Sequence, residues 1–491
     1  MQENLKAKTV SGMIWSALQR FGTMGISFVS NIVLARLLTP DDYGCIGMLA
    51  IFITISNTFV DGGFGSALIQ KTEPTQVDYS TIFWWNLFLS IILYGVLLIS
   101  APAVSRFYNI PLLESVLQVQ GVVLIINALN IVQTNQLRKS INFKRLATIH
   151  IVSHIIAATL AIVLAYMGWG VWALVAQQIV ASSITSVMLW VINRWMPSLC
   201  FSVESFKQLF SFGGFILASN LINTFCNNVQ GLLIGKFFSP AMLGYYTQAY
   251  KLENIASHSI SGVVDQVSYP VLSKVQSDKI AMKNAIYRLI SSIAYITFPL
   301  MLILIIVAKP LITLLYGIQW LPSIPYFQII CIGGIAVCLQ GVTYQAIASI
   351  GKSKELFWWT IIKRGLGLIL VVGGMLVFDM NGLLWGFVIS CWLLTIINSF
   401  LVGKFIGYNL YQQFKDLLPI FFLSVFTFIV TFLITNVVIT IYGDIHDIIN
   451  ILITVFIYIG IYIMLSYIFK LKVFLSYMDI IRNKIHGINE K

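Results

Sequence analysis

Apolar stretches with few or no charges, each about 20 residues long, recur from one end of this chain to the other. An α-helix of that length, rising about 1.5 Å per residue, crosses the hydrocarbon core of a bilayer. The composition agrees, because 58% of the residues are hydrophobic and only 10% are charged, against roughly 25% charged residues in a soluble domain. The sequence therefore predicts an all-α integral membrane protein.

Fourteen of these stretches are long enough to be predicted as transmembrane helices. The predicted ranges are about 11–35, 45–69, 81–101, 112–135, 148–166, 171–192, 208–234, 245–268, 289–308, 325–348, 357–378, 382–402, 417–440 and 448–469. An even number of crossings places both ends of the chain on the same side of the membrane.

The basic residues test this segmentation independently, since short cytoplasmic loops of membrane proteins are enriched in lysine and arginine. If the N-terminus is cytoplasmic, most of the 30 basic residues fall in cytoplasmic loops or in the tail. The basic residues that fall in outer loops are Arg36, Arg106, Lys236 and Lys309. This bias predicts cytoplasmic N- and C-termini. Orientation and contact with anionic membrane lipids account for the net charge of +12, so no nucleic-acid partner is expected.

The sequence lacks the residue patterns that are typical of catalytic and cofactor-binding sites. The six cysteines show no paired metal-type spacing and are expected to be apolar packing residues, so we predict no metal site and no cofactor. A Gly-rich phosphate-binding loop with its lysine is missing, which argues against ATP hydrolysis. The loops are also too short for the large polar domain of a membrane glycosyltransferase or polymerase. The sequence therefore favours a transporter over an enzyme.

One motif occurs twice. Residues 33–44, VLARLLTPDDYG, return in altered form at 233–244 as LIGKFFSPAMLG. In each copy an apolar helix ends in a cation, a small hydroxyl residue and a helix-breaking proline, and a glycine follows early in the next helix. A membrane protein that repeats itself in this way is typically a transporter built from two similar halves.

The repeat predicts how the helices are grouped. We expect two six-helix bundles, two additional transmembrane helices and a cytoplasmic tail, at 1–195, 205–403, 417–469 and 470–491 respectively. Because six is even, both bundles enter the membrane in the same sense. They are then parallel repeats, related by an axis along the membrane normal, with a cavity between them.

The first copy of the motif and residues 61–70, DGGFGSALIQ, resemble the polysaccharide-export branch of the multidrug/oligosaccharidyl-lipid/polysaccharide (MOP) exporter superfamily, and within it the Wzx-type flippases. The resemblance covers about residues 5–470. It implies a flippase in the bacterial inner membrane that moves an undecaprenyl-diphosphate-linked oligosaccharide repeat unit from the cytoplasmic to the periplasmic leaflet by alternating access, without ATP. The product serves O-antigen, capsule or exopolysaccharide synthesis, with a polysaccharide polymerase as an expected partner and H⁺ or Na⁺ as the coupling ion. A cation or drug antiporter of the same superfamily is the alternative.

Four basic residues fall within the predicted helices: Arg20, Lys251, Lys363 and Arg364. A cation at the bilayer centre costs about 2.5–3.5 kcal/mol even on a lenient scale, so it normally faces a water-filled cavity or a partner. These residues are candidates to bind the diphosphate. Each has a structural alternative: Arg20 and Lys251 can hold helices together, while Lys363 and Arg364 can reach the cytoplasmic surface. Adjacent side chains point about 100° apart, so one of the last two, preferably Arg364, is expected to face the cavity.

Asn220, Asn223 and Asn227 follow the spacing i, i+3, i+7 and share one face of a predicted helix. An amide stripe in hydrocarbon is unfavourable unless it meets water or polar partners. We therefore predict that these amides bind the sugar, with helix–helix hydrogen bonding as the alternative.

Acidic residues within the predicted helices are candidates for ion coupling, because a carboxyl group in a low-dielectric cavity takes up a proton readily. Glu253 lies deepest, while Asp265 and Asp61 lie near the cytoplasmic ends of their helices. Asp61 comes directly before Gly62 and Gly63, where the helix is expected to break, which also suits a purely structural role.

Overall fold

The computed structural model describes residues 2–442 and 446–489. Helices joined by short turns make up nearly all of this described part, in which no β-strand occurs. The prediction of an all-α protein is therefore confirmed. The chain forms two compact units, Met1–Thr247 and Gln248–Lys491.

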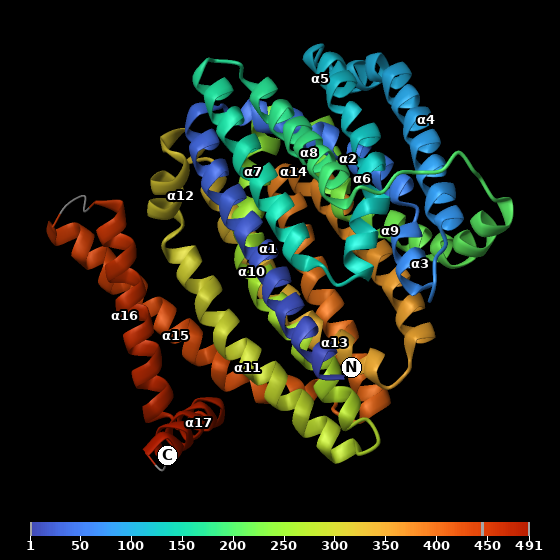
Figure 1. The fold of residues 1–491 in the computed structure, drawn as a ribbon. Helices are drawn as coiled ribbons and strands as arrows, with labels where there is room; N and C mark the ends of the chain where they lie inside the picture. The colour runs from blue at the N-terminus through green and yellow to red at the C-terminus, as the bar shows by residue number, and fades with distance from the viewer. Residues whose placement is uncertain (1, 443–445, 490–491) are drawn as a thin grey trace. The chain divides into compact units, whose positions relative to one another are not determined.

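The first unit runs from blue to green in Figure 1. Its helices are α1 (Gln2–Leu37), α2 (Pro40–Asp61), α3 (Phe64–Gln70), α4 (Gln76–Tyr108), α5 (Leu112–Gln120), α6 (Val122–Lys139), α7 (Phe143–Tyr166), α8 (Val171–Asn193), α9 (Val203–Phe237) and the start of α10 (Pro240–Lys274). Helix α9 comes from the second half of the sequence repeat, yet it belongs to this unit.

The second unit contains the rest of α10 and all later helices. These are α11 (Lys279–Ile306), α12 (Ala308–Tyr316), the 3₁₀ turn η1 (Ile318–Trp320), α13 (Ser323–Ser349), α14 (Ser353–Ile406), α15 (Leu410–Tyr442), α16 (Asp447–Ile468) and α17 (Lys472–Asn489). Helices α15 to α17, orange to red in Figure 1, form the C-terminal end of this unit.

Glycines divide two of the predicted helices. The range 45–69 falls on α2 and α3, which are separated by Gly62 and Gly63 at φ 57° and 71°. Glycine takes this left-handed conformation without the steric cost that a Cβ would bring. The range 112–135 falls on α5 and α6, with Gly121 between them.

Helix α14 is two helices joined at a kink. Phe378 (φ −134°) and Asp379 (φ 53°) depart from helical geometry at the place where the sequence predicts a break between 357–378 and 382–402. The two arms touch through glycines, because a Cβ at Gly374 would overlap the carbonyl oxygen of Gly382, and the reverse also holds. Small residues at both contact points let the two backbones approach closely.

Eleven helices of the described part are long and apolar enough to cross a membrane. The count of fourteen crossings and the bundle boundaries stay predictions. Helix α17 was not predicted, because its apolar residues alternate with charged ones and form no continuous apolar stretch. The period of an amphipathic helix is present there and would have indicated it.

Both copies of the repeated motif fold alike within the first unit. Thr39 caps α2, where its hydroxyl accepts a hydrogen bond from the Asp42 amide at 3.3 Å and its own amide donates to the Asp42 carboxylate at 2.9 Å. Ser239 has the same role at α10, accepting from the Met242 amide at 3.2 Å. Such caps satisfy backbone donors that a helix start leaves unpaired.

The start of α9 is fastened to the first unit by a polar network. The Lys71 ammonium lies 2.9 Å from the carboxylate of Asp78, which is buried at the start of α4. On α9, the Ser205 hydroxyl donates to the same carboxylate, and the Gln208 side-chain oxygen accepts from Lys71 at 3.1 Å. Because Asp78 and Ser205 are buried, their hydrogen bond is shielded from solvent and holds the start of α9 against α4.

Candidate functional site: a polar pocket between α2 and α9

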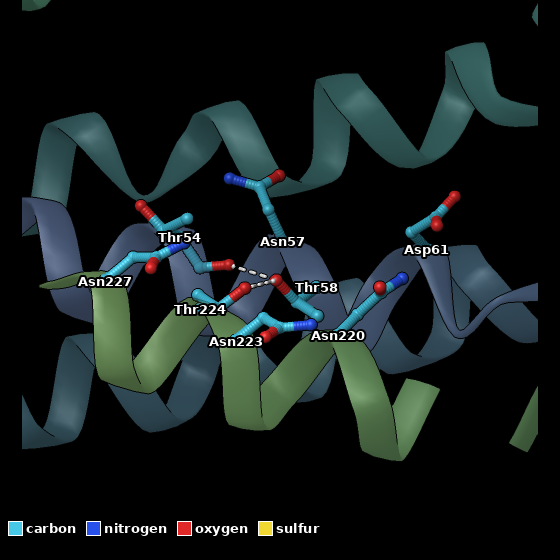
Figure 2. A pocket seen from close by; sticks show the side chains of 8 residues that line it. All are labelled: Thr54, Asn57, Thr58, Asp61, Asn220, Asn223, Thr224 and Asn227. Atoms are coloured by element: carbon cyan, nitrogen blue, oxygen red, sulfur yellow. Dashed lines mark hydrogen bonds between the residues drawn. The ribbon is translucent and has the colours of Figure 1, made fainter. Parts of the chain in front are cut away.

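A pocket of about 360 Å³ lies between α2 and α9, inside the first unit. Figure 2 shows the eight residues that line it: Thr54, Asn57, Thr58, Asp61, Asn220, Asn223, Thr224 and Asn227. The helices run antiparallel here, so Thr54 and Asn227 lie at one end of the row and Asp61 and Asn220 at the other (Figure 2). Every lining side chain is an amide, a hydroxyl or a carboxylate.

Close backbone contacts lie beyond both ends of the pocket. A Cβ at Gly63 would overlap the carbonyl oxygen of Gly213 on α9. Beyond the other end, a Cβ at Gly44 on α2 would overlap the carbonyl oxygen of Pro240, the first residue of α10. Only glycine permits such approaches. Between these two close contacts, polar side chains of α2 and α9 face each other and line the pocket.

Part of the pocket wall is held in place by hydrogen bonds. The hydroxyls of Thr58 and Thr224 lie 3.2 Å apart and connect the two helices directly (Figure 2). The side-chain oxygen of Asn57 accepts a hydrogen bond from the side-chain amide of Asn127 on α6 at 3.0 Å, and the Asn57 side-chain amide donates to the Ile53 backbone carbonyl at 3.0 Å. These groups already form hydrogen bonds within the protein, and they hold this part of the pocket wall in place.

Other lining groups make no such bonds. The side chains of Asn220, Asn223 and Asp61 have no hydrogen-bond partner in the described part of the chain. Asn220 and Asp61 are exposed to the pocket and Asn223 is half-buried. Each asparagine amide offers donors and an acceptor, while the carboxylate only accepts when ionised. These groups are therefore available to a polar ligand.

The charge of the pocket is also distinctive. Asp61 is the charged residue among the lining side chains, and none of them is a cation. Arg138 on α6 is near enough to act on Asp61 through its charge, although the two form no ion pair within the described residues. The pocket is thus built for hydrogen bonding rather than for binding an anion.

The structure brings together four residues that the sequence singled out. Asn220, Asn223 and Asn227 share one face of α9, as their spacing predicts, and Asp61 joins them from α2. Arg20 lies on α1 with its side chain exposed and does not line this pocket.

Four lining residues were missed: Thr54, Asn57, Thr58 and Thr224. The signal was present, because the α2 residues follow the spacing i, i+3, i+4, i+7 and the α9 residues repeat the same spacing. Such a set forms a continuous stripe on a helix. Two equal polar stripes on apolar helices would have indicated a shared site.

The second unit holds the buried acid predicted for ion coupling. Glu253 on α10 is only 4% exposed, and its Oε1 has no hydrogen-bond partner in the part of the chain that the structure describes. A Cβ at Gly334 of α13 would overlap that oxygen, so glycine makes the room for the carboxyl group. The side chain of Asp265 lies outside the described residues.

The basic residues of the second unit differ in their surroundings. Lys251 is exposed, whereas Lys363 is 4% exposed and its ammonium donates to the Asn398 side-chain oxygen at 2.5 Å, within α14. Arg364 is half-buried. Of these two adjacent residues of α14, Lys363 is therefore hydrogen-bonded inside the protein and Arg364 is partly exposed to solvent.

Comparison with known proteins places the chain in a family. Residues 33–325, more than half of the chain, match the family described as “Polysaccharide biosynthesis protein”. The chain belongs to this family. A similar protein is the teichuronic acid biosynthesis protein TuaB of Bacillus subtilis (strain 168), 25% identical over 428 residues that cover 86% of this chain and 88% of TuaB. Another is the lipopolysaccharide biosynthesis protein WzxC of Escherichia coli (strain K12), 23% identical over 430 residues, or 87% of each chain.

Solved structures support the same fold. The lipid II flippase MurJ in its inward closed conformation gives a TM-score of 0.73 at 15% identity, covering 96% of this chain and all of MurJ. An inward-facing multidrug resistance MATE family transporter of the MOP superfamily gives 0.58 at 14% identity, covering 81% of this chain and 98% of that one. The chain therefore has the same fold as these transporters, and this member of the polysaccharide family is a multi-pass membrane protein.

Proposed function

We propose that this protein is a flippase for a lipid-linked oligosaccharide, and that it moves an undecaprenyl-diphosphate-linked repeat unit from the cytoplasmic to the periplasmic leaflet of the bacterial inner membrane. The observation that carries the proposal is the polar pocket between α2 and α9, which lie in the segments Pro40–Gln70 and Val203–Phe237, each apolar enough to cross a membrane. Membership of the polysaccharide biosynthesis family supports it, as does the likeness to TuaB, WzxC and the MurJ fold.

The physical problem of this transport matches the chemistry of the site. The polyprenyl tail of the substrate can stay in lipid, but its sugars carry many hydroxyls that lose their water in hydrocarbon. A polar group moved into an apolar medium without a partner costs several kcal/mol. Amides and hydroxyls on α2 and α9 supply replacement partners inside a membrane protein. No covalent step is required, so the protein acts as a transporter and not as an enzyme.

The diphosphate needs positive charge, and the polar pocket has none. We assign this role to Arg20 on α1 in the first unit, and we keep Lys251 and Arg364 of the second unit as separate candidates. Lys363 is the least suited of the four predicted cations, because its ammonium is buried and already bonded to Asn398. The remaining features of the proposal come from the sequence: parallel six-helix bundles with alternating access, cytoplasmic termini, and a polymerase that receives the product.

Ion coupling is a further part of the proposal. Glu253 is buried, and its Oε1 has no hydrogen-bond partner among the residues that the structure describes. A proton gradient can then bias the transport cycle by loading and unloading this group. Asp61 and Asp265 are secondary candidates.

One observation favours a second candidate function. The α2–α9 pocket contains a carboxylate and no lining cation, which is the balance expected of a cation or drug antiporter. The family and the two curated relatives point instead to polysaccharide synthesis.

A reconstitution experiment separates the two functions. The full chain is placed in proteoliposomes that contain a fluorescent polyprenyl diphosphate oligosaccharide, and the lipid in the outer leaflet is quenched over time. We expect protein-dependent flipping of this lipid and no uptake of organic cations. Cation uptake without flipping would establish the antiporter instead. In cells that lack the protein, the lipid-linked sugar that accumulates would identify the natural substrate.

A further inference from the structure

We propose that the α2–α9 pocket is a subsite for an uncharged sugar residue of the head group, and that it discriminates against acidic sugars. The inference rests on the proposed flippase function and adds the chemical class of sugar that the pocket binds. It also separates the sugar from the diphosphate, which binds at a different place in the protein.

The unused hydrogen-bonding groups fit a neutral sugar. Asn220 and Asn223 are successive members of one helix face, and their amides have no partner in the described residues. An amide offers two donors and an acceptor, which complements hydroxyl and acetamido groups, since these also both donate and accept. A pocket of about 360 Å³ lies within the usual range for small-ligand sites.

The same pocket is unsuited to an anion. A phosphate or a uronate requires Arg, Lys or several converging backbone amides, and the lining contains no cation. Asp61 adds a like charge at the Asn220 end of the row (Figure 2). Arg138 of α6 offsets part of this charge from outside the lining, without a direct ion pair to Asp61 in the described residues. An acidic sugar would therefore meet repulsion that a neutral sugar does not.

The wall is arranged before a ligand arrives. The hydroxyls of Thr58 on α2 and Thr224 on α9 are hydrogen-bonded to each other, and the Asn57 side chain accepts a hydrogen bond from Asn127 of α6. The open amides of Asn220 and Asn223 therefore project from fixed helices. Preorganised groups bind with less loss of conformational entropy, which makes selectivity possible from a small number of hydrogen bonds.

Three synthetic lipids test the assignment: farnesyl diphosphate, and the same lipid linked to N-acetylglucosamine or to glucuronic acid. Their affinities are measured on the full-length protein in lipid nanodiscs. We expect the N-acetylglucosamine lipid to bind about tenfold more tightly than farnesyl diphosphate, and the glucuronic acid lipid to gain little. The double variant Asn220→Ala/Asn223→Ala should remove this gain while the affinity for farnesyl diphosphate stays within about twofold.

Two further variants complete the design. Asn228→Ala is the matched control, because this amide lies on the same helix but bonds to the Thr224 carbonyl at 2.8 Å and does not line the pocket. It should keep the full gain. Asp61→Asn should strengthen binding of the glucuronic acid lipid several-fold by removing the like charge.

The measured affinities distinguish failure of the sugar-subsite proposal from failure of the flippase proposal. Equal affinity for the neutral and acidic sugars, or an equal loss for all three lipids in the double variant, would overturn the subsite and leave the flippase proposal standing. If the wild type bound none of the lipids, the proposed function would fall and the subsite with it.

Discussion

Gly44 lies so close to the backbone carbonyl of Pro240 that no side chain fits between them. The same relationship holds in the other direction, since Gly244 lies against the carbonyl of Pro40. The two copies of the repeated motif therefore pack on each other through the residues that define the motif. In the sequence, the motif predicts the end of one helix and the start of the next. In the structure, its two copies also form a reciprocal contact between the starts of α2 and α10.

We expect Gly44→Ala to weaken this contact. A methyl group there overlaps the Pro240 carbonyl, and overpacking of this kind costs about 1–3 kcal/mol. The thermal midpoint of the purified protein should fall, and flipping should fall with it. Gly95→Ala is the control, since a Cβ at Gly95 meets no atom within 4 Å. The idea fails if both variants behave alike.

Replacing Arg20 tests the proposed diphosphate site. Arg20→Ala should abolish glycan export while protein level and membrane insertion stay normal, because a diphosphate loses a charge-assisted partner. Arg145→Ala removes an exposed cation near the start of α7 and should leave export unchanged. Normal export by the Arg20 variant would remove this residue from the proposal.

The two basic residues that are adjacent on α14 should respond differently. Lys363→Met keeps the length of a buried side chain and leaves Asn398 without its partner, so a loss of about 1–3 kcal/mol in stability is expected. The flipping rate of the protein that stays folded should change little. Arg364→Ala should instead lower flipping with little change in the thermal midpoint. The reverse pattern would assign the diphosphate to Lys363.

Glu253→Gln tests ion coupling, because glutamine keeps the shape of the side chain but cannot release a proton. In proteoliposomes, flipping by the variant should no longer respond to an imposed proton gradient. Glu73→Gln, in the exposed turn between α3 and α4, should keep the wild-type response. A wild-type protein that ignores both proton and sodium gradients would contradict coupling altogether.

The candidate site was only half visible in the sequence. The spacing of Asn220, Asn223 and Asn227 predicted a polar face on α9, and that face does line the pocket. The matching stripe on α2 was overlooked because it mixes threonines with Asn57 and Asp61, and a threonine in a membrane helix normally bonds to its own backbone. Thr54 does so, donating to the Ala50 carbonyl at 2.5 Å.

The sequence by itself determined where most of the long apolar helices lie, because hydrophobic length and helical period are local properties of the chain. It also determined which residues share a face of one helix. Only the tertiary structure decided that the α2 stripe meets the α9 stripe. That pairing depends on backbone contacts between residues far apart in the chain, such as Gly63 with Gly213, and a glycine carries no sign of its distant partner.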